Sequence, residues 1–311
     1  MDMKTHKNYR GITLFITGGL LGLLTILQAR ETEETDDREP VGTFLPLAGD
    51  VYFPARLTFA DEEVPVWRQD VAEALRRELI VNTYLHSQTI QLLKNAPRYF
   101  ARFEPILREE GVPDDFKYLA VIESTLNPRA VSPAGAVGLW QFLKASAREQ
   151  GLEVNEEVDE RYHLEEATRA ACRYLKRGKE RFGTWSLAAA AYNAGENNIA
   201  RQIELQEETS YHDLLLAEET SRYLFRLLAL KQVLEHPALY GFRVPERYPA
   251  EEYEEHEVSR SIDNLASFAR AQGISYKTLK RFNPWLRANT LTVKPNKTYR
   301  VAIPKNKKDY R

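Results

Sequence analysis

A helical apolar pattern dominates more than half of the sequence. Between Asp61 and about Gln232, apolar residues recur with the 3.6-residue period of an α-helix, runs of β-branched residues are rare, and Pro and Gly separate the segments. This pattern predicts a mainly α fold. We expect helices at roughly 67–85, 87–95, 99–110, 114–126, 144–150, 164–182, 186–193, 199–206 and 218–234.

The composition is that of a folded globular protein. The 311 residues are 43% hydrophobic, and 43 basic against 45 acidic side chains give a net charge of −2. These values exclude an intrinsically disordered chain and a polybasic nucleic-acid binder. Cys172 is the one cysteine, so no intramolecular disulfide is possible, and its alanine-rich helical surroundings predict a buried structural thiol.

The N-terminal segment is typical of an export signal. Residues 11–29 carry no charge and follow a positive stretch with Lys4, Lys7 and Arg10. A helix of about 19 residues, at about 1.5 Å each, approaches the thickness of a hydrocarbon core. Residues 1–29 are therefore predicted to be a signal peptide or an N-terminal membrane anchor. No cysteine follows directly, so a lipoprotein is not expected.

Changes in composition divide the rest of the chain. A polar linker over 30–60 precedes the helical unit at 61–245, and the Pro- and acid-rich stretch 246–257 indicates a second linker. Beyond it, helical spacing alternates with period-2 spacing. We predict a small α+β unit over 258–304, with a strand near Val258, helices at 263–271 and 275–283, and a strand at 299–303.

Glu123 is the candidate for acid–base chemistry. Phe116, Leu119, Ala120 and Glu123 fall at i, i+3, i+4 and i+7 of a predicted helix, so Glu123 continues an apolar stripe. Partial desolvation and the negative end of the helix dipole both favour the protonated carboxyl. The pattern predicts a raised pKa, which a general acid at neutral pH requires. A solvated glutamate at the edge of the helix face is the alternative.

The segment 132–142 (SPAGAVGLWQF) has residues suited to ligand contact. Gly138 allows close approach to the backbone, Trp140 offers a stacking face, and Gln141 offers an amide for hydrogen bonding. Taken alone, the segment is equally explained as a tight turn before a helix.

The segment 187–195 (LAAAAYNAG) places Tyr192 and Asn193 at a predicted helix end, followed by a capping glycine. Its alanines permit close helix packing. Packing and capping alone also explain this segment.

Together these segments resemble the soluble lytic transglycosylase (SLT) family, and most closely its membrane-bound D-type members. The motifs that carry the resemblance are Glu123-Ser124, Gly138 to Phe142 (GLWQF) and Ala191 to Gly195 (AYNAG). It extends over roughly 99–242 and includes residues 158–161 (VDER) and the region around Thr220 and Tyr223. In one departure, Lys144 and Ser146 stand where many members have proline and threonine.

The resemblance implies a lysozyme-like SLT catalytic domain over 61–245, with its core at 99–205. It implies cleavage of the β-1,4 bond between N-acetylmuramic acid and N-acetylglucosamine in peptidoglycan without water, leaving 1,6-anhydro ends, with Glu123 as sole general acid and base. No Asp or Glu occurs from Ser124 to Arg148, which is consistent with a single carboxylate, whereas ordinary glycosidases use two. The implied substrate-binding residues are Ser124, Gly138, Trp140, Gln141, Phe142, Tyr192 and Asn193. We expect neither a metal nor a cofactor.

The C-terminal unit resembles a LysM domain. The resemblance rests on the strand–helix–helix–strand order and on Asn283-Pro284 after the second helix. It implies binding of glycans that contain N-acetylglucosamine, and a small packing domain without a ligand is the alternative. The expected partners are peptidoglycan glycan strands, not nucleic acid, with membrane contact through residues 1–29 if that segment is retained. The expected location is the periplasm, either free or membrane-anchored.

Two other functions stay open at this point. A hydrolytic muramidase similar to goose-type lysozyme shares the fold, and it would use a second acid to hold a water and would leave reducing ends. A non-catalytic cell-wall-binding protein would need no desolvated carboxylate.

Overall fold

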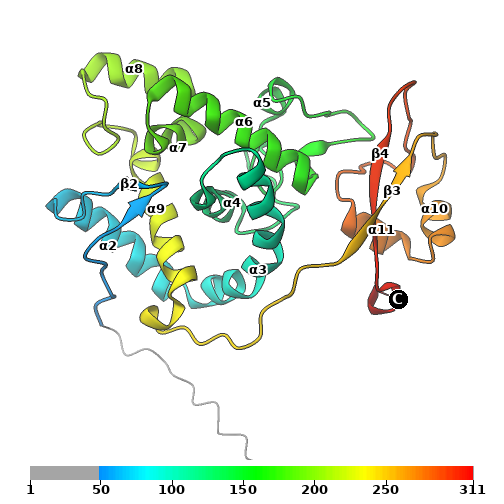
Figure 1. The fold of residues 1–311 in the computed structure, drawn as a ribbon, viewed down its shortest axis with the longest axis horizontal. Helices are drawn as coiled ribbons and strands as arrows, with labels where there is room; N and C mark the ends of the chain where they lie inside the picture. Colours follow the sequence, from blue (N-terminus) through cyan, green and yellow to red (C-terminus); the bar gives the residue numbers. More distant parts are fainter. Residues whose placement is uncertain (1–48, 311) are drawn as a thin grey trace, which may run out of the picture. The chain divides into compact units, whose positions relative to one another are not determined.

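A computed structural model describes residues 49–310 (Figure 1). The predicted export segment at 1–29 lies outside the described residues. Within residues 49–310, none of the helices has both the length and the apolar character that a bilayer-spanning segment requires.

The first part of the fold is helical, as predicted. Its elements are β1 (Thr58–Phe59), β2 (Glu62–Glu63), α2 (Gln69–Tyr84), α3 (His86–Glu109), η1 (Asp114–Phe116), α4 (Lys117–Ser124), α5 (Lys144–Glu149), η2 (Glu160–Tyr162), α6 (Leu164–Phe182), α7 (Trp185–Ala194), α8 (Glu196–Gln206), α9 (Glu218–Glu235) and η3 (Pro237–Tyr240). The two short strands β1 and β2 pair antiparallel.

Helix α4 lies among longer helices and packs against α3 and α9 (Figure 1). Tyr118, Leu119, Ala120 and Val121 are each at most 2% exposed. A helix of eight residues is not stable alone in water, so its surroundings hold it in place. Burial therefore determines where its last turn lies.

Residues 86–109 form one helix, where the sequence predicted two helices separated near Pro97. A proline inside a helix removes one backbone hydrogen bond and costs about 3 kcal/mol. Buried side chains lie on both sides of Pro97, among them Leu92, Leu93 and Phe103. Packing of this face against the core offsets the cost. Rules based on neighbouring residues in the sequence do not include such packing.

The folded part begins before the predicted boundary at residue 61. Leu57 and Phe59 are buried in the core, and Val51 and Phe53 pack against it. The prediction of a polar linker over 30–60 is therefore wrong from residue 51 onward. Most charges of that stretch lie at 30–39, and they obscured the apolar residues that follow.

The C-terminal unit has the predicted strand–helix–helix–strand order. It consists of β3 (Tyr253–Val258), α10 (Leu265–Ala271), α11 (Tyr276–Phe282) and β4 (Tyr299–Pro304), followed by η4 (Lys307–Tyr310). Strands β3 and β4 pair antiparallel from Tyr253↔Pro304 to Val258↔Tyr299. Strand β3 starts inside the stretch 246–257 predicted as a linker. Only Val258 in β3 is buried, so the strand lacks the alternation that marks a half-buried strand.

Helices α6 and α7 pack closely through small side chains. Cys172 on α6 is buried and free, and burial raises the pKa of its thiol to about 12. The prediction of a structural thiol is confirmed. At Gly178 a Cβ atom would lie 3.1 Å from the Ala188 Cβ and 3.2 Å from its Cα, so α7 lies as close to α6 as a glycine permits.

We expect Gly178→Leu to destabilise the protein by about 2 kcal/mol or more, because the larger side chain forces α6 and α7 apart. Urea unfolding measures the loss. Glu180→Leu places the same side chain on an exposed position of α6 and is the control. Equal stability of the two variants would contradict close packing at Gly178.

Candidate active site

A cavity of about 670 Å³ brings the three sequence motifs together. Glu123 from α4 lines it, together with the loop between α4 and α5 and the end of α7. Glu219 from α9 is a further carboxylate in its lining. The residues that line it are Glu123, Ser132, Pro133, Ala134, Ala136, Gln141, Phe142, Leu143, Ser146, Tyr174, Tyr192, Asn193, Ala194, Gly195 and Glu219.

Glu123 occupies the last turn of α4, as predicted, and its carboxyl group is largely removed from water. Burial raises the pKa of Glu123 to about 7. The hydroxyl of Tyr223, which donates a hydrogen bond to Glu123 Oε1, and the charge of Arg226 both oppose this rise. The carboxyl group is therefore close to half protonated at neutral pH.

Helix α4 ends one residue after Glu123, two residues earlier than predicted. Thr125 and Leu126 both adopt left-handed backbone conformations, with φ of 51° and 57°. Such conformations are uncommon for residues with a side chain, and for β-branched ones especially. The Thr125 amide still donates to the Val121 carbonyl, at 2.9 Å, and closes the last turn. No further helical turn follows the Glu123 carboxyl.

Tyr223 is a site residue to which no role was assigned from the sequence. It lies on α9, 100 residues from Glu123, and it is 2% exposed. Burial raises the pKa of Tyr223 well above 10, so its hydroxyl donates at neutral pH. The one sequence signal was its place in the region of family resemblance, because a tyrosine on a buried helix face is otherwise typical of core packing.

Tyr192 and Asn193 line the cavity as predicted, and both are held by hydrogen bonds to neighbouring elements. The Tyr192 hydroxyl donates to the Trp140 carbonyl at 2.7 Å, which ties the end of α7 to the loop. Asn193 Oδ1 accepts from the Thr220 hydroxyl at 2.8 Å, which ties it to α9. These contacts fix the side chains that face the cavity.

Gln141 and Phe142 also line the cavity. Gln141 has a left-handed backbone with φ of 49°, and its Nε2 donates to the Gly138 carbonyl at 2.8 Å. The Phe142 ring packs edge-on against Tyr192, with 5.9 Å between the ring centroids. The loop is thus closed on itself and packed on α7.

Three predicted contact residues serve the scaffold instead. Trp140 is fully buried and its Nε1 donates to the Thr168 hydroxyl at 2.9 Å, so its ring does not offer the predicted stacking face to a ligand. The buried Ser124 hydroxyl donates to the Ala120 carbonyl at 2.9 Å within its own helix. A Cβ atom at Gly138 would lie 2.1 Å from the Arg161 carbonyl oxygen, so this glycine lets two backbones approach.

Residues 49–310 contain no group of three or more His, Cys, Asp or Glu side chains placed to hold a metal ion. The chemistry visible in the cavity is that of a carboxyl group with a pKa near neutrality, a buried phenol, amides and aromatic rings. This set suits proton transfer to and from a bound polar ligand.

Comparison with known proteins finds a family model that matches part of each unit. Residues 102–215 match the family model of the transglycosylase SLT domain, and residues 254–307 match that of the soluble lytic transglycosylase C-terminal LysM-like domain. Both resemblances predicted from the sequence are confirmed.

The chain is homologous to membrane-bound lytic murein transglycosylase D of Escherichia coli K12, with 29% identity over 226 residues. The match covers 71% of this chain and 49% of that protein, so the chain spans about half the length of this relative. The peptidoglycan transglycosylase of Escherichia phage T7 is 34% identical over 140 residues, or 43% of this chain and 10% of its own. The solved 70 kDa soluble lytic transglycosylase of Escherichia coli has a TM-score of 0.39 and 21% identity, covering 48% of this chain and 26% of its own.

The raised pKa of Glu123 makes stability depend on pH. Its folded pKa of about 7 exceeds the usual 4.5, so the folded state loses stability as the pH rises through 7, whereas glutamine does not titrate. We compare the free energy of unfolding of Glu123→Gln with that of the wild type at each pH. We expect the difference, variant minus wild type, to be about 2 kcal/mol larger at pH 8 than at pH 4.5. Urea unfolding at both pH values measures this. A difference that does not change with pH would contradict the burial of Glu123.

Proposed function

We propose that this homologue of lytic murein transglycosylase D, with its SLT and LysM-like domains, is a peptidoglycan lytic transglycosylase. It cleaves the β-1,4 bond between N-acetylmuramic acid and N-acetylglucosamine without water. The observation that carries the proposal is the half-buried Glu123 carboxyl, which lines a cavity large enough for sugar rings and has a pKa of about 7.

Glu123 acts first as an acid and then as a base. In its protonated form it donates its proton to the glycosidic oxygen while the bond from that oxygen to C1 breaks. The resulting carboxylate then takes the proton of the sugar's 6-hydroxyl as O6 bonds to C1. The proton is thereby returned to Glu123, and the product carries a 1,6-anhydro ring. A pKa near the working pH suits both steps, and the Tyr223 hydroxyl stabilises the carboxylate between them.

The cavity residues hold the glycan around this carboxyl. Gln141, Phe142, Tyr192 and Asn193 offer amides and ring faces to sugar rings. The scaffold residues Ser124, Gly138 and Trp140 set the positions of α4 and the loop without touching substrate.

The other assignments extend the same proposal. The LysM-like domain, which begins at β3, binds glycan strands of the wall, and the catalytic unit extends from about residue 51 to residue 245. Residues 1–29 direct the chain out of the cytoplasm. The protein then acts in the periplasm, either free or anchored to the membrane. The support is the charge pattern of that segment and the murein substrate named for the relative.

One observation favours hydrolysis as a second candidate. Glu219 is an exposed carboxylate in the cavity lining, and an inverting muramidase needs a second acid to hold its water. Under that mechanism the product would carry an ordinary reducing end.

The first test is mass spectrometry of muropeptides released from purified sacculi. We expect anhydro ends, one water lighter than reducing ends, from the wild type. For Glu123→Gln we expect the rate to fall by about a thousandfold or more, because glutamine can neither donate nor accept the proton. Reducing ends from the wild type would support the hydrolase, and full activity of the variant would overturn the proposal.

The second test uses Tyr223→Phe. Loss of this hydrogen bond leaves desolvation less opposed, so the pKa of Glu123 rises. Since Glu123 must begin protonated, we expect the basic limb of the pH dependence of kcat/KM to move up by about one pH unit.

Tyr211→Phe is the matched control for this test. The buried Tyr211 hydroxyl donates to the Thr220 and Ser221 carbonyls of α9, the helix that carries Tyr223, and it does not contact Glu123. The basic limb should stay in place in this variant. A limb that fails to move in Tyr223→Phe would show that Tyr223 does not tune Glu123.

A further inference from the structure

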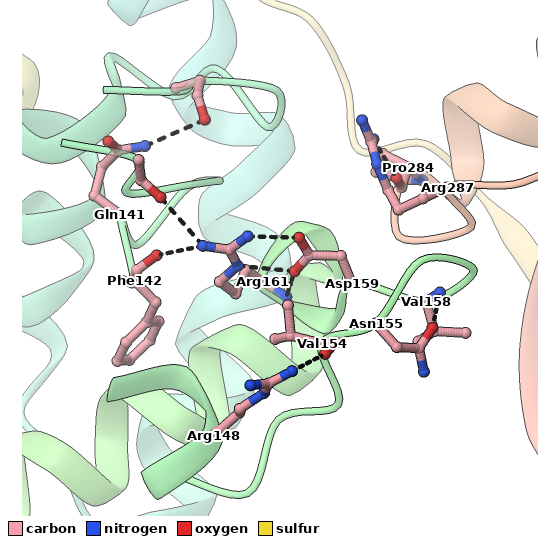
Figure 2. Close-up of polar contacts among 12 residues, drawn as sticks. Gln141, Phe142, Arg148, Val154, Asn155, Val158, Asp159, Arg161, Pro284 and Arg287 are labelled. Atoms are coloured by element: carbon pink, nitrogen blue, oxygen red, sulfur yellow. Dashed lines mark hydrogen bonds and ion pairs between the residues drawn. The ribbon is translucent and has the colours of Figure 1, made fainter. Parts of the chain in front are cut away.

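A buried ion pair lies between the C-terminal unit and residues 135–142, which we call the cavity loop. Asp159 and Arg161 belong to the segment that connects α5 to α6, and their side chains are each 9% exposed. Arg161 donates from Nε to Asp159 Oδ1 at 2.9 Å and from Nη2 to Asp159 Oδ2 at 2.7 Å. This two-pronged geometry leaves Nη1 of Arg161 free to reach elsewhere (Figure 2).

Arg161 uses that nitrogen to hold the cavity loop. Its Nη1 donates to the Gly135 carbonyl at 3.2 Å. It also donates to the Phe142 carbonyl at 3.3 Å (Figure 2). The Arg161 carbonyl is also the atom against which Gly138 packs. One arginine thus contacts the start, middle and end of the segment 135–142, which includes residues of the cavity lining.

The C-terminal unit binds the same connecting segment through backbone hydrogen bonds. The Asp159 amide donates to the Trp285 carbonyl at 2.9 Å, and the Arg287 amide donates to the Glu157 carbonyl at 2.7 Å. These bonds flank an antiparallel bridge between Val158 and Leu286. The two units therefore meet in a short stretch of sheet-like pairing.

Side chains strengthen this junction. The Glu157 carboxylate accepts from the Thr292 amide at 2.7 Å and from the Thr290 hydroxyl. The Arg287 guanidinium lies over the Tyr162 ring, 4.1 Å from its centroid.

The junction also has a shared apolar core. Val137, Val158 and Tyr162 from the helical unit are buried in one cluster with residues of the C-terminal unit. Val137 immediately precedes Gly138, so a side chain of the cavity loop forms part of this core. Residues of the C-terminal unit in the cluster include Leu265, Leu279, Trp285, Leu286, Leu291 and Val301.

We propose that the C-terminal unit braces the substrate cavity, with Asp159 and Arg161 as the positioning residues that link its docking surface to the cavity loop. The docking surface consists of residues 284–292 together with residues 157–159. Undocking it removes the contacts that hold Asp159, and through Arg161 it frees the carbonyls of Gly135 and Phe142. The effect on catalysis rests on the proposed function, whereas the effect on the loop does not.

Two variants of the full-length chain test the brace from its two ends. Glu157→Ala removes the acceptor for residues 290 and 292 at the docking surface. Arg161→Lys keeps the charge and loses the planar fork that bonds Asp159 and the loop together. Glu255→Ala and Arg300→Lys make the same changes in an exposed ion pair within the C-terminal unit and are the matched controls.

The first readout is amide hydrogen exchange of residues 131–142, followed by mass spectrometry. Several amides there bond within the loop, for example Gly138 to the Ala130 carbonyl at 2.9 Å. We expect both test variants to speed exchange by about tenfold or more, and the controls to leave it unchanged. Glu157→Gln keeps one acceptor oxygen and should restore part of the protection. Unchanged exchange in folded Glu157→Ala would overturn the brace, even if Arg161→Lys fails to fold.

The second readout is kcat/KM on a soluble glycan, measured across pH. We expect both test variants to lose about tenfold or more, because a cavity displaced by a fraction of an ångström orients substrate poorly. The basic limb set by Glu123 should not move, since neither residue contacts it. Faster exchange with wild-type kinetics would contradict positioning. Faster exchange in a chain without lytic activity would support the brace and overturn the proposed function instead.

Discussion

The burial of helix α4 determines both how the surrounding helices pack and how far the Glu123 carboxyl group is removed from water. Helix α4 is too short to be stable alone, and enclosing helices bury it up to the turn that carries Glu123. The same burial raises the pKa of that carboxyl to about 7. The packing of α4 and the pKa of Glu123 therefore change together, because any change that loosens α4 also rehydrates the Glu123 carboxyl.

The elements around α4 are tied to one another by hydrogen bonds to backbone atoms. The Tyr192 hydroxyl on α7 donates a hydrogen bond to the Trp140 carbonyl, and the Arg161 guanidinium donates to the carbonyls at both ends of the cavity loop. Backbone acceptors hold the chain path itself, so side chains of the loop are free to face a ligand. The C-terminal unit extends this scaffold, since it contributes to the core that contains Val137.

Sequence reasoning found those parts of the site that depend on local pattern. The apolar stripe placed Glu123 correctly, and the order of three motifs predicted segments that do meet in one cavity. It misjudged Trp140, because an aromatic ring beside glycines suits a core as well as a ligand face, and only the fold places its Nε1 against Thr168. It assigned no role to Tyr223, whose contact joins residues 100 positions apart. The helix break predicted near Pro97 was wrong because tertiary packing outweighs the local tendency of proline to end a helix. The start of strand β3 was missed because the strand is largely exposed and so lacks alternating apolar residues.

In the proposed mechanism Glu123 works as the only catalytic carboxylate. Glu219 is the one other carboxylate among the described residues that line the cavity, so its replacement shows whether a second acid takes part. The measurement is the rate and product of Glu219→Gln on purified sacculi in ¹⁸O-labelled water. We expect a rate within about threefold of the wild type, with anhydro ends that contain no ¹⁸O. A loss of about a hundredfold or more, or reducing ends labelled with ¹⁸O, would contradict this mechanism.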